Sequence, residues 1–400
     1  MIKIIMPDNS QPVAMKFAKG SHIIVEGRPN ANRFYIIKKG LVQITREADS
    51  IVPAENTAGS GEMFGVVSAM ASRSYIESAI AMTNVTVLAA GRNHIIQSTP
   101  IAVNIIRQFS QRLRKLDEAY SKRLLKNAAS DDPSHLFQIG AYYERVRKSD
   151  QALYAYRQYL AYCPNTEKSS IAKEKIKKLE PHSKVNRPVY SPDIMVQKYP
   201  KNCLLFAEGE TGHNLYIIQE GSVKITKIVD NQEVILAVLN KGDILGEMAM
   251  LEDKPRAATA EIYEDSTLLS VNQTNFTSLI NEQPDMVIRL TTLMAERIWL
   301  LYRQLTNTLI KDPKGRIYDA LLIQLEKNRV DLSSTNPYLC SFGFKELVSM
   351  AGYPESKANE LYNTIAGEKT IAVNQEKLFV INIASVLKEA EYYRKSRKAD

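Results

Sequence analysis

Residues 244–259 read Ile-Leu-Gly-Glu-Met-Ala-Met-Leu-Glu-Asp-Lys-Pro-Arg-Ala-Ala-Thr. Gly246 lets the backbone approach a ligand closely, and residues 247–251 predict one helical turn whose free N–H groups and dipole would face an anion. Arg256 can place its planar fork on a phosphate. Glu247 is only an acceptor when ionised, so it would serve a separate group such as a sugar hydroxyl. The stretch therefore predicts an anion cradle, and a loop ion pair between Glu247 and Arg256 is the alternative.

The chain contains the same domain twice. Residues 34–45 read Phe-Tyr-Ile-Ile-Lys-Lys-Gly-Leu-Val-Gln-Ile-Thr, and residues 215–226, which lie 181 positions later, read Leu-Tyr-Ile-Ile-Gln-Glu-Gly-Ser-Val-Lys-Ile-Thr. Short runs rich in Val, Ile and Tyr between Gly and Asn predict the strands of a small β-roll in each copy. We expect the two copies at residues 10–125 and 190–308.

Each copy ends in a predicted long helix that carries an apolar stripe with spacings of three and four. The stripe residues are Ile106, Phe109, Leu113, Leu116 and Tyr120 in the first copy, and Leu290, Met294, Ile298, Leu301, Leu305 and Leu309 in the second. Such a stripe packs on its own roll, on a partner helix, or on both. The strict alternation in the first copy favours a homodimer seam, and core packing alone stays open.

Residues 244–259 resemble the phosphate-binding cassette of cyclic nucleotide-binding domains, whose pattern runs Phe-Gly-Glu-Leu-Ala-Leu, a short gap, then Pro-Arg-Ala-Ala-Thr. The resemblance implies a cyclic mononucleotide whose phosphate lies on Arg256 and on backbone N–H groups, and whose ribose 2′-hydroxyl lies on Glu247. The expected ligand-binding residues are Gly246, Glu247, Met248, Ala249, Arg256, Ala257, Ala258 and Tyr302.

The base of the nucleotide is less closely defined. In this family, cGMP-preferring domains often carry Thr directly after the cassette Arg, and Ala257 at that position favours cAMP over cGMP. By register, Leu301 and Tyr302 of the second long helix fall where the family caps the base. Tyr302 would stack on a purine, or it packs in the helix seam.

The first copy keeps the roll and loses the site. In its equivalent stretch, residues 64–79, Val66 and Tyr75 replace the sugar-binding Glu and the phosphate-binding Arg. Arg73 lies two positions early, and Glu77 would lie close to where the phosphate belongs. We expect this copy to bind no cyclic nucleotide and to serve dimerisation or structure, or to hold an unrelated ligand.

Between the copies, residues 131–180 predict a polar helical spacer. Its spacing follows a tetratricopeptide repeat, a helix–turn–helix unit of about 34 residues. The marker residues are Ile139, Gly140, Tyr143, Ala152, Tyr156 and Pro164. Only one copy and a trailing helix at residues 169–179 are visible, and a lone repeat cannot bury its face by itself. We expect a spacer docked on the rolls, with a groove for a protein partner as the alternative.

Residues 312–390 predict a winged helix–turn–helix. Pro313 and Gly315 mark a hinge before an amphipathic helix. The following helices are expected at residues 344–351 and 355–365, and the strands at 371–373 and 378–383. Such a domain would lay its second helix in the major groove of DNA. Roll, long helix, hinge and winged helix together resemble the catabolite activator/FNR family of bacterial transcription regulators.

The helix that would read DNA departs from that family, whose members typically begin it Ser-Arg-Glu-Thr-Val-x-Arg. Glu355 and Glu360 stand at the two Arg positions. Glutamate accepts only from cytosine amino groups and repels phosphate. Ser356, Lys357 and Asn359 remain as candidate DNA contacts.

Composition narrows the function classes. The 44% hydrophobic and 24% charged residues are ordinary for a globular protein. The chain has no paired-carboxylate site, Walker loop or GxGxxG motif, so we expect no enzyme. Three cysteines that lie far apart and scattered histidines predict no metal site and no prosthetic group. The sparse cysteines and the lack of a signal peptide or membrane span predict a cytoplasmic location.

The basic residues behind the net charge of +8 are concentrated in one segment of the chain. Residues 101–200 hold 19 Lys and Arg against 10 Asp and Glu, and the other 300 residues sum to −1. The excess therefore falls on the first long helix and on the spacer, which it marks as a surface for an acidic partner or for non-specific contact with phosphate. It does not fall on the helix that would read DNA.

Together these features predict an α+β protein with two rolls, a helical spacer and a winged helix. The resemblance implies a transcription regulator in which a cyclic nucleotide in the second roll gates the winged helix. A nucleotide sensor that acts through protein partners and does not bind DNA is the alternative.

Overall fold

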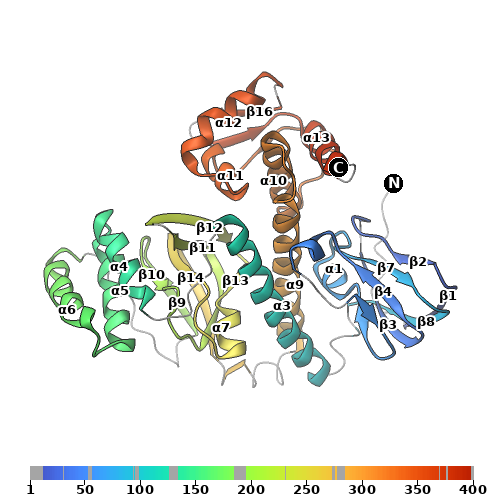
Figure 1. The fold of residues 1–400 in the computed structure, drawn as a ribbon, viewed down its shortest axis with the longest axis horizontal. Helices are drawn as coiled ribbons and strands as arrows, with labels where there is room; N and C mark the ends of the chain where they lie inside the picture. The colour runs from blue at the N-terminus through green and yellow to red at the C-terminus, as the bar shows by residue number, and fades with distance from the viewer. Residues whose placement is uncertain are drawn as a thin grey trace. The chain divides into compact units, whose positions relative to one another are not determined.

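The computed structural model describes residues 12–29, 31–52, 56–92, 94, 99–125, 134–183, 195–229, 231–272, 275–276, 284–368, 370–374 and 377–397. It falls into two compact units (Figure 1). The first comprises Met1–Ala119 and Gln273–Leu305, and the second comprises Tyr120–Asn272 and Thr306–Asp400. The N-terminus and the expected boundaries at residues 10, 131 and 190 lie outside the described residues.

The first unit holds the first roll. Its elements are β1 (Val13–Phe17), β2 (His22–Ile24), β3 (Phe34–Lys39), β4 (Val42–Thr45), β5 (Thr57–Ala58), β6 (Met63–Phe64), α1 (Val66–Ala71), β7 (Ser78–Ala81) and β8 (Val85–Ala90). They form two four-stranded antiparallel sheets in the orders β1-β8-β3-β6 and β2-β7-β4-β5. Alternate residues of β7 are buried, as expected of a strand with one face on a core. The core between the sheets includes Ile37, Val42, Phe64 and Val87.

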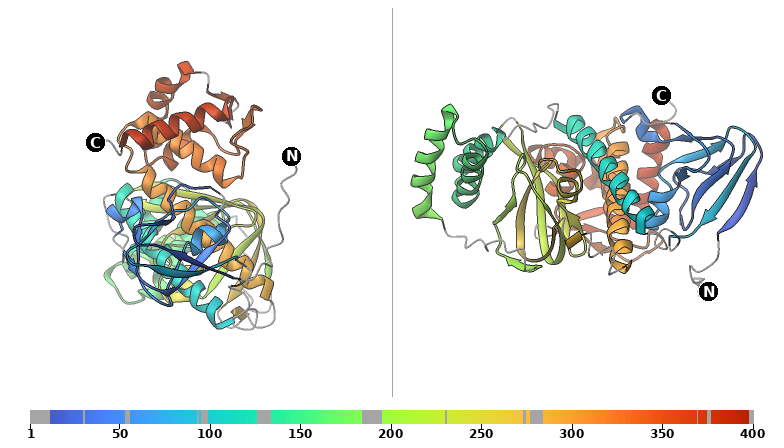
Figure 2. Two further views of the ribbon diagram at one scale, coloured as in Figure 1. Left: turned by 90° about the vertical axis from the view of Figure 1, so that its right-hand side faces the viewer. Right: turned by 90° about the horizontal axis from the view of Figure 1, so that it is seen from below.

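Two long helices complete the first unit, apart from their last residues, which belong to the second unit. They are α3 (Thr99–Leu125) and α9 (Pro284–Asn307), and they run side by side in the views of Figures 1 and 2. The predicted stripes are buried along both helices, except that Leu309 follows the end of α9. The Arg112 guanidinium on α3 lies 4.9 Å from the ring centre of Tyr302 on α9. The two helices therefore pack on one another within a single chain.

The second unit holds the second roll. Its elements are β9 (Val196–Tyr199), β10 (Leu204–Phe206), β11 (Asn214–Val229), β12 (Gln232–Asn240), β13 (Ile244–Leu245), α7 (Glu247–Glu252) and β14 (Thr259–Asn272). Strands β10-β14-β11-β12 form the sheet, with β13 on β11 and β9 on β14. Tyr216 pairs with Leu245 in this roll, and Tyr35 pairs with Phe64 in the first. The repeat in the sequence is therefore a repeat in strand register.

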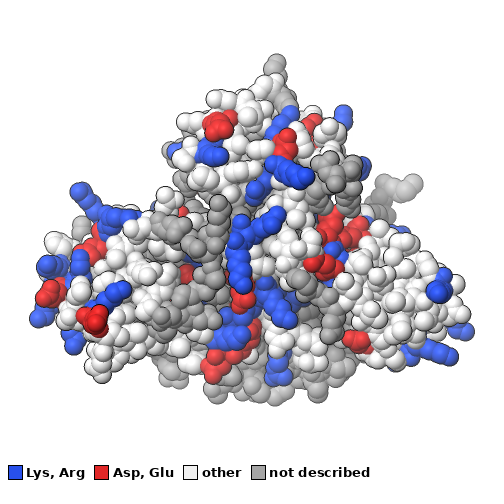
Figure 3. Space-filling view, in the orientation of Figure 1, with Lys and Arg blue, Asp and Glu red and all other residues white. Residues whose placement is uncertain are grey.

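Three helices, α4 (His135–Arg145), α5 (Ser149–Tyr162) and α6 (Glu167–Leu179), form the spacer. At Gly140, a Cβ atom would lie 2.8 Å from the Tyr156 ring, so the close approach of α4 to α5 requires glycine. The last helix begins two residues before the expected residue 169 because Thr166 and Ser169 form its capping box. On the face in Figure 3, basic side chains gather over these helices, with acidic side chains among them.

The C-terminal part of the second unit follows the expected order of elements with four differences. Its elements are α10 (Pro313–Lys327), β15 (Tyr338–Leu339), α11 (Phe344–Met350), α12 (Ala358–Ile365), β16 (Ile371–Asn374), β17 (Lys377–Val380) and α13 (Ile383–Arg397). The expected helix at 355–365 begins with a 3-10 turn, Glu355–Lys357. The expected strand at 378–383 ends at Val380, because Asn382 accepts the N–H of Ser385 at 2.9 Å and starts α13. Neither α13 nor β15 was predicted. No described helix is long and apolar enough to span a membrane.

Candidate nucleotide site in the second roll

The cassette turns sharply at Gly246. This residue has φ +77°, in the left-handed region, and directly precedes α7. A Cβ atom at this position would overlap the Arg256 guanidinium. The helix α7 has only six residues, so the feature it offers a ligand is a set of backbone N–H groups rather than a long dipole. Glycine is therefore needed here for both backbone conformation and space.

Arg256 is the buried cation of the site. It is 4% exposed, its Nη1 donates to the carbonyl of Gly246 at 2.7 Å, and its guanidinium lies 4.2 Å from the ring centre of Phe206. Its Nε is buried without a hydrogen-bond partner among the described residues. Burial lowers the pKa of Arg256 below its ordinary value, although Tyr216 and Glu210 nearby oppose this shift. A bound anion would supply the hydrogen-bond partner that Nε of this guanidinium lacks.

The other predicted ligand residues of the cassette lie around this cation. Glu247 is fully buried at the first position of α7, and Met248 and Ala249 follow it within the helix. Ala257 is partly exposed, and Ala258 is 9% exposed. The structure thus brings the cassette residues of the prediction together.

Tyr302 has a different location. It belongs to the first unit, where its hydroxyl accepts a hydrogen bond from Nη2 of Arg112 at 3.0 Å. The cassette belongs to the second unit. The structure therefore supports the seam alternative for Tyr302, and the role as a cap on the base stays a prediction.

The loop of residues 207–213 is part of the site and was missed as such. The carbonyl of Glu210 accepts the N–H of Arg256 at 2.8 Å, and the N–H of Gly209 donates to the carbonyl of Arg256 at 2.9 Å. A Cβ atom at Gly212 would overlap the Arg256 guanidinium. The loop therefore closes over Arg256, and only the absent side chain at Gly212 hinted at this.

The spacer holds the same loop. The hydroxyl of Tyr154 on α5 donates to Oε2 of Glu210 at 2.7 Å, and the hydroxyl of Tyr162 lies 2.6 Å from Oγ1 of Thr211. A displacement of α5 would therefore move a loop that touches the cation of the site.

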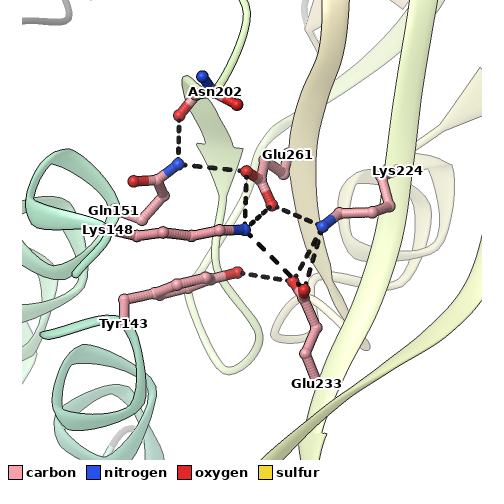
Figure 4. Close-up of polar contacts among 7 residues, drawn as sticks. All are labelled: Tyr143, Lys148, Gln151, Asn202, Lys224, Glu233 and Glu261. Carbon is pink, nitrogen blue, oxygen red and sulfur yellow. Dashed lines mark hydrogen bonds and ion pairs between the residues drawn. The ribbon is translucent and has the colours of Figure 1, made fainter. Parts of the chain in front are cut away.

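A charged network docks the spacer on the second roll (Figure 4). Glu261 on β14 pairs with Lys224 on β11 at 2.9 Å and with Lys148 at 3.3 Å. Lys224 also pairs with Glu233 on β12 at 3.1 Å. Gln151 on α5 donates to Glu261 at 3.1 Å. The spacer is therefore docked on the second roll through polar contacts as well as apolar ones.

The candidate DNA contacts lie on the surface of the second unit. Ser356 and Lys357 lie in the 3-10 turn, and Asn359 lies in α12; all three are exposed. Glu360 is exposed on the same helix. Arg394 of the basic C-terminal segment pairs with the buried Asp319 of α10. This arginine therefore belongs to the folded domain and not to a solvated tail.

Two segments of the chain, residues 14–98 and 196–283, match the family model of the cyclic nucleotide-binding domain. The chain therefore contains two such domains in tandem, one in each roll. It is similar to the cAMP-activated global transcriptional regulator CRP of Salmonella typhimurium, with 33% identity over 129 residues, which are 32% of this chain and 61% of the relative. The cyclic AMP receptor protein of Thermus thermophilus is 26% identical over 174 residues, which are 43% of this chain and 77% of that protein.

Among solved structures, a transcriptional regulator of the CRP/FNR family from Thermus thermophilus has 18% identity and a TM-score of 0.39, and it covers 49% of this chain and 98% of its own. The chain spans about three fifths of the length of several curated relatives that it matches. The sequence comparisons confirm the resemblance to catabolite activator/FNR-type regulators with tandem nucleotide-binding domains. A relative that is a regulator agrees with the expectation of a non-enzyme.

Proposed function

We propose that the chain is a cytoplasmic transcription regulator that responds to a cyclic nucleotide bound in the second roll. The observation that carries this proposal is Arg256, a buried guanidinium with an unpartnered Nε beside the backbone N–H groups of α7. The acceptor for a ribose hydroxyl is Glu247, which is buried next to it. A cyclic nucleotide offers both an anion and that hydroxyl.

Titration calorimetry with cAMP and cGMP tests this site. Arg256→Ala removes a charge-assisted bond worth about 1.5–3 kcal/mol, or about 10–150-fold in affinity. Lys254→Ala is the matched control, because Lys254 is an exposed cation two residues away. Unchanged binding by Arg256→Ala would refute the site.

The proposed effector is cAMP in preference to cGMP. Ala257 follows the cassette arginine and has no hydroxyl to offer a guanine. A lower dissociation constant for cGMP than for cAMP in the same titration would overturn this preference. The titration should include cyclic dinucleotides as a second class of ligand.

We propose that residues 312–390 form a winged helix–turn–helix that binds DNA through Ser356, Lys357 and Asn359. Their exposure at the start of α12 supports this role. Nucleotide binding would change the affinity for DNA only if the two DNA-binding states differ in nucleotide affinity. Genomic DNA recovered with the protein, with and without cAMP, tests the proposal; a nucleotide-dependent footprint supports it.

A second candidate function is a nucleotide sensor that acts on protein partners. The exposed Glu360 on α12 favours it, because a carboxylate repels the DNA backbone. The TPR-like spacer would be the second contact surface. Tight cAMP binding together with no footprint would support this candidate over the first.

A homodimer through the long helices is the expected assembly. Since α3 and α9 already pack on one another within one chain, a dimer would use surfaces outside that shared seam or exchange helices between chains. The assembly is therefore a separate question from ligand binding.

A further inference from the structure

The first roll contains a buried carboxylate at its degenerate cassette. Glu77 is 4% exposed, and its Oε1 accepts the backbone N–H of Gly65 at 2.6 Å. Its Oε2 accepts a hydrogen bond from Nε of Arg46 at 3.0 Å and lies 2.9 Å from Nη2 of the same arginine. The side chain of Arg46 is 10% exposed. Glu77 is therefore held by a two-pronged arginine contact and a backbone donor, as a bound oxyanion would be.

Backbone contacts place this carboxylate at the position that corresponds to the second roll's cassette. The N–H of Tyr75 donates to the carbonyl of Arg28 at 3.0 Å, as that of Arg256 does to Glu210 at 2.8 Å. Gly65 has φ +75° and ψ 3°, and Gly246 has φ +77° and ψ 3°. Tyr75 thus occupies the position in the first roll that Arg256 occupies in the second. Two positions further on, the first roll has Glu77 and the second has an alanine.

The cluster continues into the long helices of the first unit. Nη2 of Arg112 on α3 lies 3.8 Å from Oε2 of Glu77 and donates to the hydroxyl of Tyr302 on α9 at 3.0 Å. One carboxylate therefore connects the roll with both helices.

We infer that Glu77 is a built-in anion that takes the place of a bound phosphate in the first roll and holds Arg46, Arg112 and the long helices without any ligand. The second roll presents the cation Arg256 and has Ala258 at the position of Glu77; the first roll supplies both the anion at that position and its cations. The comparison with a phosphate rests on the proposed function of the second roll.

The charge state of Glu77 agrees with this assignment. Burial opposes ionisation, but Arg46, Arg112 and the N–H of Gly65 outweigh it and hold the pKa of the Glu77 carboxyl below its ordinary value. The carboxylate is therefore ionised at neutral pH, as an anion surrogate must be.

The test is anion rescue of a Glu77→Ala variant in the full chain. The variant also carries Arg256→Ala, so that anion binding in the second roll does not contribute to the measured change. Trp299 is the only tryptophan of the chain, it lies in the first unit, and its Nε1 donates to the carbonyl of Ser74 at 3.1 Å. Its fluorescence therefore follows the melting of this unit. Removing one partner of a buried ion pair is expected to lower the melting temperature by about 10 °C.

Acetate supplies the atoms that the substitution removes, and inorganic phosphate supplies the proposed equivalent. We expect either anion at millimolar concentration to restore about half of the lost melting temperature, and chloride at equal ionic strength to restore none. Rescue by acetate without rescue by phosphate would overturn the equivalence with a phosphate. No loss of melting temperature, or equal rescue by chloride, would overturn the whole inference.

Glu77→Gln covers the case in which the alanine variant does not fold. It keeps the size and an acceptor for Gly65 but loses the charge that holds Arg46. We expect a lower melting temperature and no rescue by either anion, because the amide fills the space. A variant that melts like its parent contradicts the role of the charge. None of these results depends on whether the second roll binds cAMP, which the calorimetry on Arg256 decides separately.

Discussion

Replacing Glu261 with glutamine removes the central charge between the helical spacer and the second roll. Glu261 is 3% exposed, and its carboxylate pairs with Lys224 and Lys148 (Figure 4). The amide can still accept the hydrogen bond from Gln151, so the substitution tests charge rather than shape.

The magnitude follows from the burial of each partner. Breaking a buried ion pair by removing one partner costs about 3–5 kcal/mol. The side chain of Lys224 is 9% exposed but keeps Glu233, and that of Lys148 is 33% exposed, so solvent screens its share. We therefore expect a loss at the low end, about 3 kcal/mol of unfolding free energy, most of it through Lys224.

The loss should depend on pH with a definite sign. Burial opposes ionisation of Glu261, but Lys224 and Lys148 outweigh it and hold the pKa of the Glu261 carboxyl below its ordinary value. A lowered folded-state pKa stabilises the fold above the unfolded pKa, about 4.3, and this contribution is lost as the pH falls through the folded value. The difference between wild type and Glu261→Gln should therefore be full at neutral pH and shrink in acid.

Urea unfolding followed by far-ultraviolet circular dichroism measures this difference, because the single tryptophan lies in the other unit. Glu220→Gln is the matched control: Glu220 is an exposed glutamate on β11, and its substitution should stay within about 0.5 kcal/mol. If Glu261→Gln unfolds at the urea concentration of wild type at pH 7, the network does not hold the spacer.

Three further predictions concern the loop, the spacer and the assembly. Gly212→Ala should weaken cAMP binding at least tenfold in calorimetry, because the new methyl group overlaps the guanidinium of Arg256; unchanged affinity would show that the loop does not fix this cation. The carboxylate of Glu208, whose Oε2 lies 3.5 Å from Nε2 of His135, raises the pKa of His135 against its burial. The stabilisation from this pair is therefore full below about pH 6.5 and is lost as the pH rises through the folded pKa. His135→Gln should therefore lower unfolding free energy at pH 6 and not at pH 9, and an equal loss at both would contradict this. Since α3 and α9 pack on one another within one chain, charge substitutions on that seam should unfold the chain rather than convert a dimer into folded monomers. Sedimentation velocity with circular dichroism measures both, and a folded monomer would contradict this prediction.

The sequence predicted those parts of the fold and site that depend on local spacing. The 181-residue repeat, the buried stripes and the cassette from Gly246 to Arg256 are all encoded in short stretches whose residue types have direct physical consequences. The register of Tyr75 with Arg256 followed from the same repeat, and the backbone hydrogen bonds of the two loops agree with it.

What escaped prediction depends on contacts between distant segments. Glu77 was placed near the phosphate position, but its partners Arg46 and Arg112 lie 31 and 35 residues away and carry no motif. The helix α13 lies in a charged C-terminal segment, where Arg394 pairs with Asp319 of α10. No local pattern reports such pairs.

The central claim is that the second roll binds a cyclic nucleotide and the first roll does not. Titration calorimetry of the full chain with cAMP tests it most directly. The account predicts one site per chain, an affinity about 10–150-fold weaker in Arg256→Ala, and no change in the Lys254→Ala control. Two sites per chain, or unchanged binding by Arg256→Ala, would contradict it.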